Sequence, residues 1–561
     1  MSTTITNVDI QIINAQVLDV FNLTFETTTI WIKDNKIYAL GSQPTLLAHQ
    51  IFDAKNNYVV PGIIDAHMHI ESSLLNPVEF GKLALTRGIT TVFADPHEIA
   101  NVKGTIGLDY MLAAGNDSPI TIQYMLPSSV PAVSFEHAGA TLTASDLKPY
   151  YQYQQVGGLA EVMDFPAVES ANPDMLTKIN DALQANKQVD GHTAGLLNSQ
   201  LDIYRYYGIA TDHESRNAQE ALARIRAGFY VYLREGTVER DLQHLLPAVN
   251  AHNYTRFAFA TDDKTVSDIL AEGGVDFNIA KAIKLGLKPA MAYTMASLNA
   301  AQSHLINDLG AIAPGFIADL LIIDNLETVH VLNVMKNGHF TKHTDTKSKA
   351  WNYPCMNYTL GDLKLTLSGE YAHVIGIKPG HIDTEHLVLP VPSANHVFLP
   401  STKHDLAKIV VVERHKNLGT MGLGIVKGLG LTGGAIASSI SHDSHNLIAA
   451  GMDDQAIKLA IEAIAKTNGG LAVVSADYHV TILPLSIAGL MSDQDYLTVN
   501  ADYQNLLNSF KKISAVSYDP FLTLSFLALP VIPTLKITDQ GLFDFTKFSF
   551  IDINASSSTI I

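Results

Sequence analysis

Residues 61–73 read PGIIDAHMHIESS, an apolar run that ends in two histidines separated by a single residue. In a β-strand the side chains at i and i+2 point to the same face, so His67 and His69 present their imidazoles together. The residues before them are apolar on both faces, which is typical of a strand buried in a parallel sheet. This stretch therefore predicts a buried parallel strand with half of a metal site at its end.

Further apolar segments of the same kind follow, separated by helical stretches, and this alternation indicates parallel β/α units. With the first, the predicted strands are 63–69, 90–95, 120–126, 158–163, 188–192, 209–213, 229–234 and 257–262. Eight strands over about 200 residues match the size of a (β/α)8 TIM-type barrel. Barrel enzymes place reactive side chains at the carboxyl ends of their strands. Those ends carry His69, Asp95, Glu161, His192, His213 and Asp262.

The segments on either side of the predicted barrel at 61–304 have a different pattern. Residues 1–60 contain short alternating runs typical of strands, and residues 305–345 return to that pattern. We expect the two segments to form one small flanking β-sandwich, built from both sides of the barrel. Residues 350–561 are expected to form a C-terminal α/β domain, with a helical pattern at 454–466.

Length and composition agree with several well-buried domains. The chain has 561 residues, and single cores usually stop growing at about 250 to 300 residues. Apolar residues make up 47% and charged residues 16%, which indicates a globular protein rather than a disordered one. The formal net charge of −18 would repel a phosphate backbone, and no basic patch offsets it, so no nucleic-acid partner is expected.

The single cysteine, Cys355, cannot form an intramolecular disulfide, and the polar start at 1–7 lacks a basic region followed by an apolar stretch. Both features fit a reducing cytoplasm. No apolar run reaches the roughly 18 residues that a membrane span needs, so we expect a soluble protein without a membrane partner. The sequence locates no subunit interface, and it is compatible with a homo-oligomer.

Histidines and carboxylates at the predicted strand ends make a candidate metal centre. Imidazole with carboxylate suits zinc, iron or manganese, whereas calcium prefers oxygen ligands alone. Six ligands are enough for two ions: His67, His69, Glu161, His192, His213 and Asp262. Two dications against two carboxylates favour a bridging hydroxide, because coordination lowers the pKa of water to roughly 7. Asp262 can then take the proton of that hydroxide and pass it to the leaving group.

Longer motifs run along the chain. They are PGIIDAHMHIESS at 61–73, ADPHEIANVKG at 94–104 and GLAEVMDFPAV at 158–168, followed by DGHTAGL, TDHES, ATDDK and, at 439–446, SISHDSHN. Together they resemble the adenine deaminase branch of the amidohydrolase superfamily. The resemblance implies two divalent ions, Mn2+ or Fe2+, held by the same six residues, and hydrolysis of adenine to hypoxanthine and ammonia. Hydantoinases and dihydroorotases of this superfamily usually carry a carboxylated lysine where this chain has Glu161, which argues against their activities.

The proton donor to the purine ring is left open by the sequence. His97 and Glu98 are candidates, because they lie in a polar loop on the catalytic side of the predicted barrel. The alternative is that they only cap the helix that follows. Asp65 would share the inward face of His67 one layer deeper, where a structural role is expected.

A second polar segment lies in the C-terminal domain, after a glycine-rich stretch. Its residues His442, Asp443, Ser444 and His445 are expected to fold over the barrel mouth, where they exclude water or contact the purine. The alternative is a loop that covers nothing. A third metal site is less expected, since no strand framework supports these residues.

The glycine-rich stretch itself contains a match to G-x-G-x-x-G at Gly428, Gly430 and Gly433. Such a motif binds a pyrophosphate only when it follows a buried strand and opens a helix. No clear buried strand precedes it, so tight turns explain these glycines better.

Two alternatives to adenine deaminase remain at this point. Another binuclear amidohydrolase would use the same ions on a cyclic amide or an N-acetyl substrate. A noncatalytic relic would bind a purine or metal without turnover, but the chain retains every predicted ligand, which argues against it. An assay of ammonia release from adenine would distinguish adenine deaminase from these two alternatives.

Overall fold

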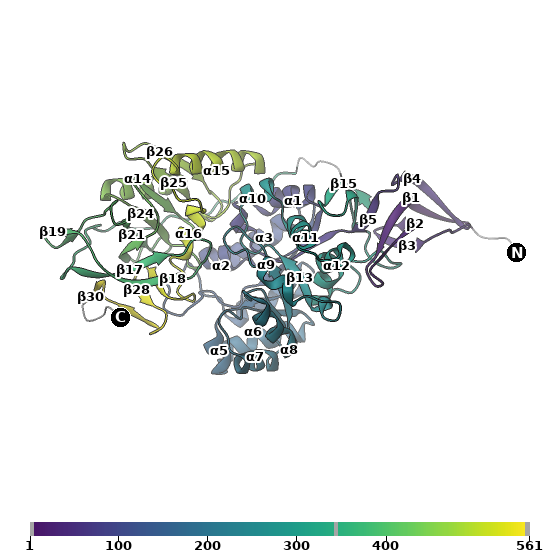
Figure 1. Cartoon of the computed structure of the whole chain (residues 1–561), viewed down its shortest axis with the longest axis horizontal. Coiled ribbons are helices and arrows are strands. Elements are labelled where there is room, and N and C mark those ends of the chain that lie inside the picture. Colours follow the sequence, from purple (N-terminus) through teal and green to yellow (C-terminus); the bar gives the residue numbers. More distant parts are fainter. Residues whose placement is uncertain (1–4, 342–345, 556–561) are drawn as a thin grey trace.

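The computed structural model describes residues 5–341 and 346–555. The predicted domain limits extend through residues 1–4, 342–345 and 556–561, which lie outside the described residues. The fold is a mixed α/β structure with a C-terminal domain. Figure 1 shows the N-terminal strands at one end of the long axis, the C-terminal domain at the other, and the helix-rich central region between them.

Strands from both sides of the central region join in one sheet. Its order is β16-β15-β14-β5-β1-β2-β3, and β4 pairs with β1 beside this path. The strands are β1 (Thr6–Asp19), β2 (Thr24–Lys33), β3 (Lys36–Leu40), β4 (Leu46–Asp53), β5 (Tyr58–Pro61), β14 (Leu320–Asn325), β15 (His330–Lys336) and β16 (His339–Phe340). The sheet folds over itself, because the ring of Phe52 on β4 lies 4.4 Å from that of Phe340 on β16.

Parallel strands occupy the central region in chain order. One sheet contains β6 (Ile63–Met68), β7 (Ile89–Ala94), β8 (Thr121–Leu126), β9 (Val156–Val162) and β10 (Gln188–Gly191), and another contains β11 (Thr211–Asp212), β12 (Tyr230–Arg234) and β13 (Phe257–Ala260). The two sheets meet at both edges. Ala210 N–H donates to Val189 O at 3.0 Å beside β10, and Asp262 N–H donates to His67 O at 3.0 Å beside β6. Each predicted strand is present, with small differences at its ends.

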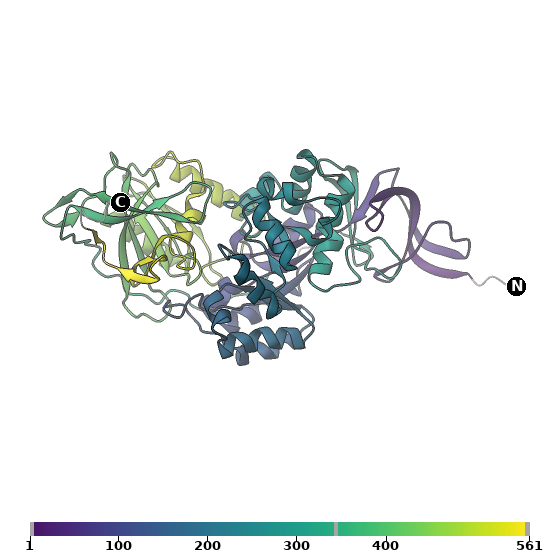
Figure 2. The same cartoon turned by 60° about the horizontal axis from the view of Figure 1, so that its bottom comes forward.

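Helices pack around these strands, as Figure 2 also shows. They are α1 (Pro77–Thr86), α2 (His97–Lys103), α3 (Thr105–Gly115), α4 (Ala144–Leu147), α5 (Phe165–Glu169), α6 (Pro173–Gln184), α7 (Asn198–Tyr206), α8 (Ala218–Ala227), α9 (Leu242–Leu245), α10 (Val266–Ala271), α11 (Val275–Lys284), α12 (Pro289–Thr294) and α13 (Ala300–Ser303). Asparagine caps followed by proline start two of them, at Asn76 and Asn172. Across residues 5–341 and 346–555, no helix combines the length and apolarity needed to span a bilayer.

The C-terminal domain is built on a second large sheet of order β18-β17-β22-β21-β24-β23-β25-β26, with β30 beside β17. Its strands are β17 (Tyr371–Ile377), β18 (Thr384–Pro390), β21 (Leu406–Val412), β22 (Met421–Lys427), β23 (Ala435–Ser438), β24 (Leu447–Gly451), β25 (Gly470–Val474), β26 (Val480–Pro484) and β30 (Asn554–Ala555). Shorter strands are β19 (Ser393–Ala394), β20 (Val397–Phe398), β27 (Leu535–Thr538), β28 (Gly541–Asp544) and β29 (Ser549–Ile551).

Helices α14 (Asp454–Lys466), α15 (Tyr496–Phe510) and α16 (Pro520–Phe526) complete this domain. The predicted helix at 454–466 is confirmed at both ends. Asp453 caps its N-terminus by accepting from Ala456 N–H at 2.8 Å. Ile457, Ile461 and Ile464 recur at helical spacing and are fully buried, so one face of α14 lies against the sheet.

One expectation about the glycine-rich stretch was wrong. It contains a clear strand, β22, which pairs with β21 and β17. Glycine at 422 serves close packing, since a Cβ there would lie 2.0 Å from the carbonyl oxygen of Thr538. The interpretation of the later glycines as turns is confirmed. Gly428 and Gly430 have φ values of 116° and 60°, and strand β23 follows them where the phosphate motif would need a helix.

A buried histidine beneath the first parallel strand generates a prediction about acid stability. His304 Nε2 lies 2.8 Å from Ala66 O, and its ring stacks on Phe93 at 3.5 Å. Its Nδ1 is buried and has no hydrogen-bond partner within the described structure. Burial lowers the pKa of His304 to about 3, so the folded protein keeps this imidazole neutral.

In the unfolded chain the same imidazole titrates near its ordinary pKa of about 6.5. Below that pH the unfolded state binds one more proton, so the free energy of unfolding should fall by about 2 kcal/mol between pH 6.5 and 5 from this residue alone. His304→Gln should remove this residue's share of the fall in the free energy of unfolding at low pH. Urea unfolding midpoints at pH 7 and pH 5 measure that fall. The exposed His49→Gln is the control. Equal acid losses in His304→Gln and the wild type would contradict the prediction.

Candidate metal and catalytic site

The side chains predicted as metal ligands lie close together in the structure. They are His67, His69, Glu161, His192, His213 and Asp262, from the ends of β6, β9, β10, β11 and β13. His67 and His69 face inward together, with ring centroids 5.1 Å apart, as the period-two argument predicts. Their donor atoms form overlapping groups in which all atoms lie within 4.8 Å of one another.

Glu161 lies between these groups. Its Oε1 is 3.5 Å from His69 Nε2, while its Oε2 is 2.8 Å from His192 Nδ1 and 3.1 Å from His213 Nε2. Burial opposes its ionisation, but His213 and His192 outweigh burial and hold the pKa of Glu161 well below its usual value. Glu161 is therefore ionised and directs one oxygen at each group of histidines.

Asp262 faces the first pair of histidines. Its Oδ1 is 3.2 Å from His69 Nε2 and 3.8 Å from His67 Nε2, and its Oδ2 accepts from Arg234 Nη1 at 2.7 Å. Although burial opposes ionisation, the bond to His69 and the charge of Arg234 hold the pKa of Asp262 well below its ordinary value. The residue is therefore ionised, with one oxygen held by Arg234 and the other directed at the histidines.

Unpartnered nitrogens test whether this cluster fits a metal. His67 Nε2 and His213 Nδ1 are buried without a hydrogen-bond partner in the described ranges. Burial also lowers the pKa of His67 well below its usual value, so its imidazole is neutral and has a free lone pair. Imidazoles and ionised carboxylates are the ligands that divalent transition metals prefer. Although burial opposes it, the neighbouring carboxylates raise the pKa values of His69, His192 and His213, so metal binding would displace protons from these three imidazoles. The residues present fit divalent metal binding.

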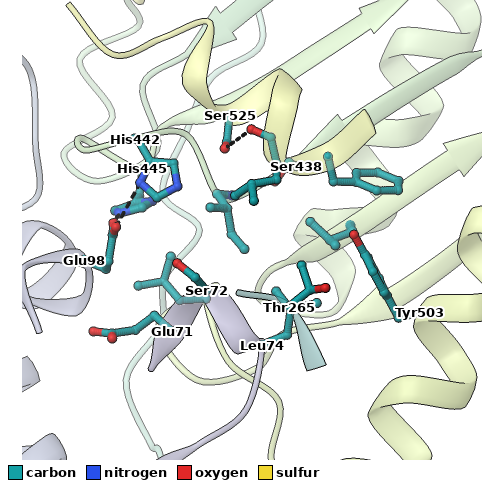
Figure 3. Close-up of a pocket in the computed structure, with 15 residues that line it drawn as sticks. Glu71, Ser72, Leu74, Glu98, Thr265, Ser438, His442, His445, Tyr503 and Ser525 are labelled. Atoms are coloured by element: carbon teal, nitrogen blue, oxygen red, sulfur yellow. Dashed lines mark hydrogen bonds and ion pairs between the residues drawn. The ribbon is translucent and has the colours of Figure 1, made fainter. Parts of the chain in front are cut away.

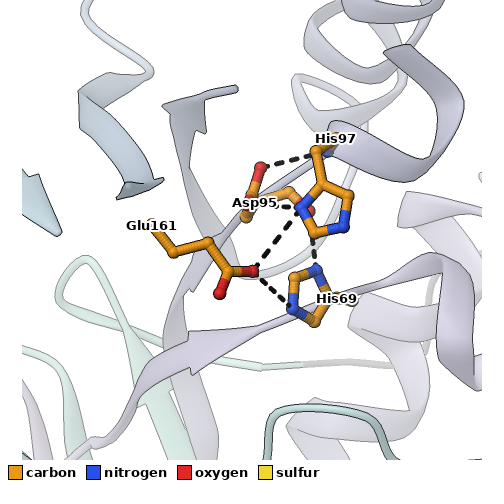
Figure 4. A group of neighbouring side chains, drawn as sticks. All are labelled: His69, Asp95, His97 and Glu161. Carbon is orange, nitrogen blue, oxygen red and sulfur yellow. Dashed lines mark hydrogen bonds and ion pairs between the residues drawn. The ribbon is translucent and has the colours of Figure 1, made fainter. Parts of the chain in front are cut away.

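The loop after β7 brings His97 against the cluster, as Figure 4 shows. Its Nδ1 lies 2.6 Å from Asp95 Oδ2, and its backbone N–H donates to Asp95 Oδ1 at 3.0 Å. Asp95 thus orients the ring and also binds the first N–H of α2. The other ring nitrogen, His97 Nε2, lies 3.4 Å from Glu98 Oε1 and 3.8 Å from Asp443 Oδ1.

Glu98 lies between two histidines of the C-terminal domain (Figure 3). His442 Nδ1 is 2.9 Å from its Oε1, and His445 Nε2 contacts its Oε2. Ser441 N–H donates to His445 Nδ1 at 3.3 Å, so the hydrogen of His445 is on Nε2 and points at Glu98. Although burial opposes protonation of His442, Glu98 raises its pKa to about 9. The C-terminal domain therefore completes the polar site above the metal cluster.

The whole segment from His442 to His445 is buried, between β23 and β24. Within the described part of the chain, His442 Nε2 and Asp443 Oδ2 are buried without a hydrogen-bond partner. Glu98, His442 and His445 also lie within 4.8 Å of one another, a grouping that the sequence did not predict. Both ring nitrogens of His445 have partners in the structure, the backbone N–H of Ser441 and the carboxylate of Glu98.

Sequence reasoning missed two buried ionisable residues here. Arg234 ends β12, and its only local signal is a charge at the end of an apolar strand. Glu71 lies two residues after His69, and burial together with Glu98 raises its pKa to about 8. With Glu98 and His442 it lines a small pocket whose other walls include Leu74, Tyr503 and Leu522 (Figure 3). A protonated Glu71 can donate a hydrogen bond there.

Comparisons with known proteins show which families the chain resembles. The model of the Amidohydrolase family matches residues 58–341, and that of the Adenine deaminase C-terminal domain matches residues 381–549. The chain is 54% identical to "Adenine deaminase" of Leuconostoc citreum, covering 97% of this chain and 98% of the relative. It is 51% identical to "Adenine deaminase 1" of Oenococcus oeni, covering 97% and 99%.

Solved structures are more distant. A "Beta-aspartyl dipeptidase" from Fervidobacterium islandicum is 18% identical, with a TM-score of 0.46, over 61% of this chain and 98% of its own. A likeness of this size decides nothing about the activity of the chain.

The central place of Glu161 generates a prediction about metal content. Glu161→Gln keeps the size of the side chain but removes the charge that both groups of histidines share. We expect its bound metal to fall by more than half relative to the wild type, measured by elemental analysis of purified protein. Asp319→Asn, a buried acid paired with Lys336 away from the site, is the control. Unchanged metal content in Glu161→Gln would contradict the bridging geometry.

Proposed function

Because the chain belongs to the adenine deaminase family of the amidohydrolases, it deaminates adenine, and we propose that the reaction takes place at the buried cluster around Glu161. Hydrolysis replaces the amino group at C6 by oxygen and gives hypoxanthine and ammonia. The observation that carries this assignment is the ionised Glu161, which lies between two groups of imidazoles at the carboxyl ends of parallel strands.

We further propose that strands β6 to β13 form a (β/α)8 barrel at residues 61–304. The pairing of the two parallel sheets at both edges supports this proposal. Residues 1–60 and 305–345 would then form the flanking small β domain, and residues 350–561 the C-terminal domain. In this arrangement the metal cluster lies at the barrel mouth that the C-terminal domain covers.

The proposed cofactors are two divalent ions, Mn2+ or Fe2+. His67, His69 and Asp262 would hold one ion, and His192 and His213 the other, with Glu161 shared between them. The unpartnered Nε2 of His67 supports this division. When bound, such ions lower the pKa of water and so supply a nucleophile at neutral pH.

Asp262 is proposed as the group that takes the proton of the attacking hydroxide, while the proton lost when water becomes hydroxide restores the group that protonates the purine ring. Its carboxylate is ionised, its Oδ1 faces the cluster, and Arg234 fixes its Oδ2. After addition at C6, Asp262 returns this proton to the departing amino group, which leaves as ammonia.

Glu98 and His97 are proposed to deliver the proton that the purine ring requires. Addition at C6 moves electrons onto the neighbouring ring nitrogen, which must gain a proton before ammonia leaves. His442 and His97 lie 2.9 Å and 3.4 Å from the same oxygen of Glu98, so either can share a proton with it. Asp95 keeps the His97 ring in this orientation.

The segment from His442 to His445 is proposed to close the site over the purine. Asp443 Oδ2 is a buried acceptor without a partner among residues 5–341 and 346–555, and a ring N–H of adenine would satisfy it. Ser444 and His445 hold the segment in place, through a backbone contact to His415 and the contact to Glu98. Closure of this kind excludes water from the reacting atoms.

The activity and the role of Asp262 are tested together. Metal-loaded protein should release ammonia from adenine, and Asp262→Asn should lower kcat by roughly 10²- to 10⁴-fold, because its amide cannot accept the proton. An ammonia assay at saturating adenine measures both, with Asp319→Asn as the control. No ammonia from the metal-loaded wild type would sink the proposed function, and near-normal turnover in Asp262→Asn would remove that residue from proton transfer.

Glu98→Gln separates proton transfer from metal binding. Glu98 contacts His97, His442 and His445 but none of the six proposed ligands. The variant should therefore keep the wild-type metal content while kcat falls by roughly 10²- to 10⁴-fold. Elemental analysis and the same ammonia assay measure the two quantities. Loss of metal in step with activity would speak against a proton-transfer role.

A further inference from the structure

A fully buried arginine lies behind the segment that closes the site. Arg414 follows β21, has no exposed surface and lies in the C-terminal domain. Its guanidinium donates to backbone carbonyl oxygens at four places: Cys355 at 2.7 Å, Ser439 at 3.2 Å, Ala488 at 3.1 Å, and His445. One planar cation thus collects carbonyl groups from four separate stretches of the chain.

Two of these carbonyl groups hold the closing segment, His442 to His445. Ser439 lies three residues before the segment and His445 ends it, and both bind the same rigid guanidinium. The backbone N–H of Arg414 also donates to Asn446 Oδ1 at 3.2 Å. The next residue, His415, places its Nε2 2.7 Å from the carbonyl oxygen of Ser444. The exit of β21 therefore holds the segment at several points.

Among the described residues, no carboxylate lies within ion-pair distance of the Arg414 guanidinium. The carboxylate beside it, that of Glu413, instead accepts from the backbone N–H groups of His415, Lys416 and Leu418. Burying a cation without a carboxylate is unfavourable unless its donors are satisfied. Four of its five N–H groups meet carbonyls here, which the three donors of lysine could not reproduce.

The backbone around the guanidinium leaves no spare room. A Cβ added at Gly489 would lie 3.0 Å from both Nη1 and Nη2 of Arg414. Gly489 has a φ of 75°, a conformation that favours glycine. Burial lowers the pKa of Arg414 to about 10, so the group stays charged at neutral pH. The position is thus shaped for a charged guanidinium.

We propose that Arg414 is a positioning residue for the deamination reaction, which holds His445 against Glu98 and thereby aims the Glu98 carboxylate. The connection is short: Arg414 Nε donates to His445 O, and the ring of the same histidine donates to Glu98. The inference rests on the proposed proton-transfer role of Glu98. It adds that the C-terminal domain sets the geometry of that group from outside the pocket.

Arg414→Lys tests the proposal, because lysine keeps the charge but cannot span Ser439 and His445 together. We expect kcat to fall on the order of 100-fold, since displacements of about 1 Å at a reacting group have effects of that size. KM and metal content should stay near the wild-type values. Lys408→Met is the matched control: Lys408 is a buried cation on the same β21 that donates to Leu363 O and to Asp454, neither of which belongs to the closing segment.

Rescue of kcat by added guanidinium distinguishes a positioning role from a merely structural one. Arg414→Ala leaves a cavity of the right shape, and guanidinium added below its unfolding concentration should restore part of kcat. The same addition should leave Glu98→Gln and Lys408→Met unchanged. Restored kcat without a change in thermal midpoint supports positioning. Restoration only in step with a rising midpoint would overturn it.

The remaining outcomes separate the positioning role of Arg414 from the proposed proton-transfer role of Glu98. Folded Arg414→Lys with wild-type kcat overturns the inference, and so does a loss that matches only the unfolded fraction. If Glu98→Gln is also fully active, the proposed role of Glu98 fails instead. If no Arg414 variant folds, Gly489→Ala provides the test, because its Cβ would lie 3.0 Å from both Nη1 and Nη2 of Arg414 and must displace the guanidinium, so kcat should fall. A folded Gly489→Ala with unchanged kcat would then overturn the inference.

Discussion

Burial of like charges is the constraint on which this structure depends. Glu161, Asp262 and Glu98 are almost fully removed from water, and each is surrounded by groups that favour its ionised form. A buried carboxylate is tolerated only when cations or donors compensate its lost hydration. The parallel strands supply imidazoles from below, and Arg234 supplies a guanidinium from the side. The C-terminal domain supplies His442 from above. The charge balance of the site therefore depends on how the C-terminal domain packs against the parallel strands.

Much of the part of the site at the ends of the parallel strands could be predicted from the sequence, because it follows from strand geometry. Two histidines at i and i+2 must share a face, and parallel strands must bring their ends to one edge. The part of the site that includes residues of the C-terminal domain follows no such local rule. Glu98 meets His445, 347 residues away, and nothing in the spacing of either indicates the contact. Arg414 and Arg234 were missed for the same reason, since a single buried arginine leaves no periodic pattern.

The error at β22 has a related cause. Glycines usually indicate turns, but Gly422 is there because the carbonyl of Thr538 approaches its Cα closely. Sequence patterns report which face a residue shows, and they do not report which distant segment lies against it. The helix α14 was predicted well because its caps and its apolar stripe are both local. The placement of the closing segment depends on contacts between domains, which only coordinates reveal.

The mixed origin of the first sheet affects how the protein is made. Strand β14 pairs with β5, with Leu320 opposite Pro61, so the N-terminal strands lack that partner until the central region has been synthesised. At about 5 to 20 residues per second, the ribosome needs roughly 10 to 50 s to add those residues. During that interval β5 emerges as an unpaired edge, the kind of surface that invites aggregation or a chaperone. The length of the central region therefore sets how long this edge stays unpaired during synthesis.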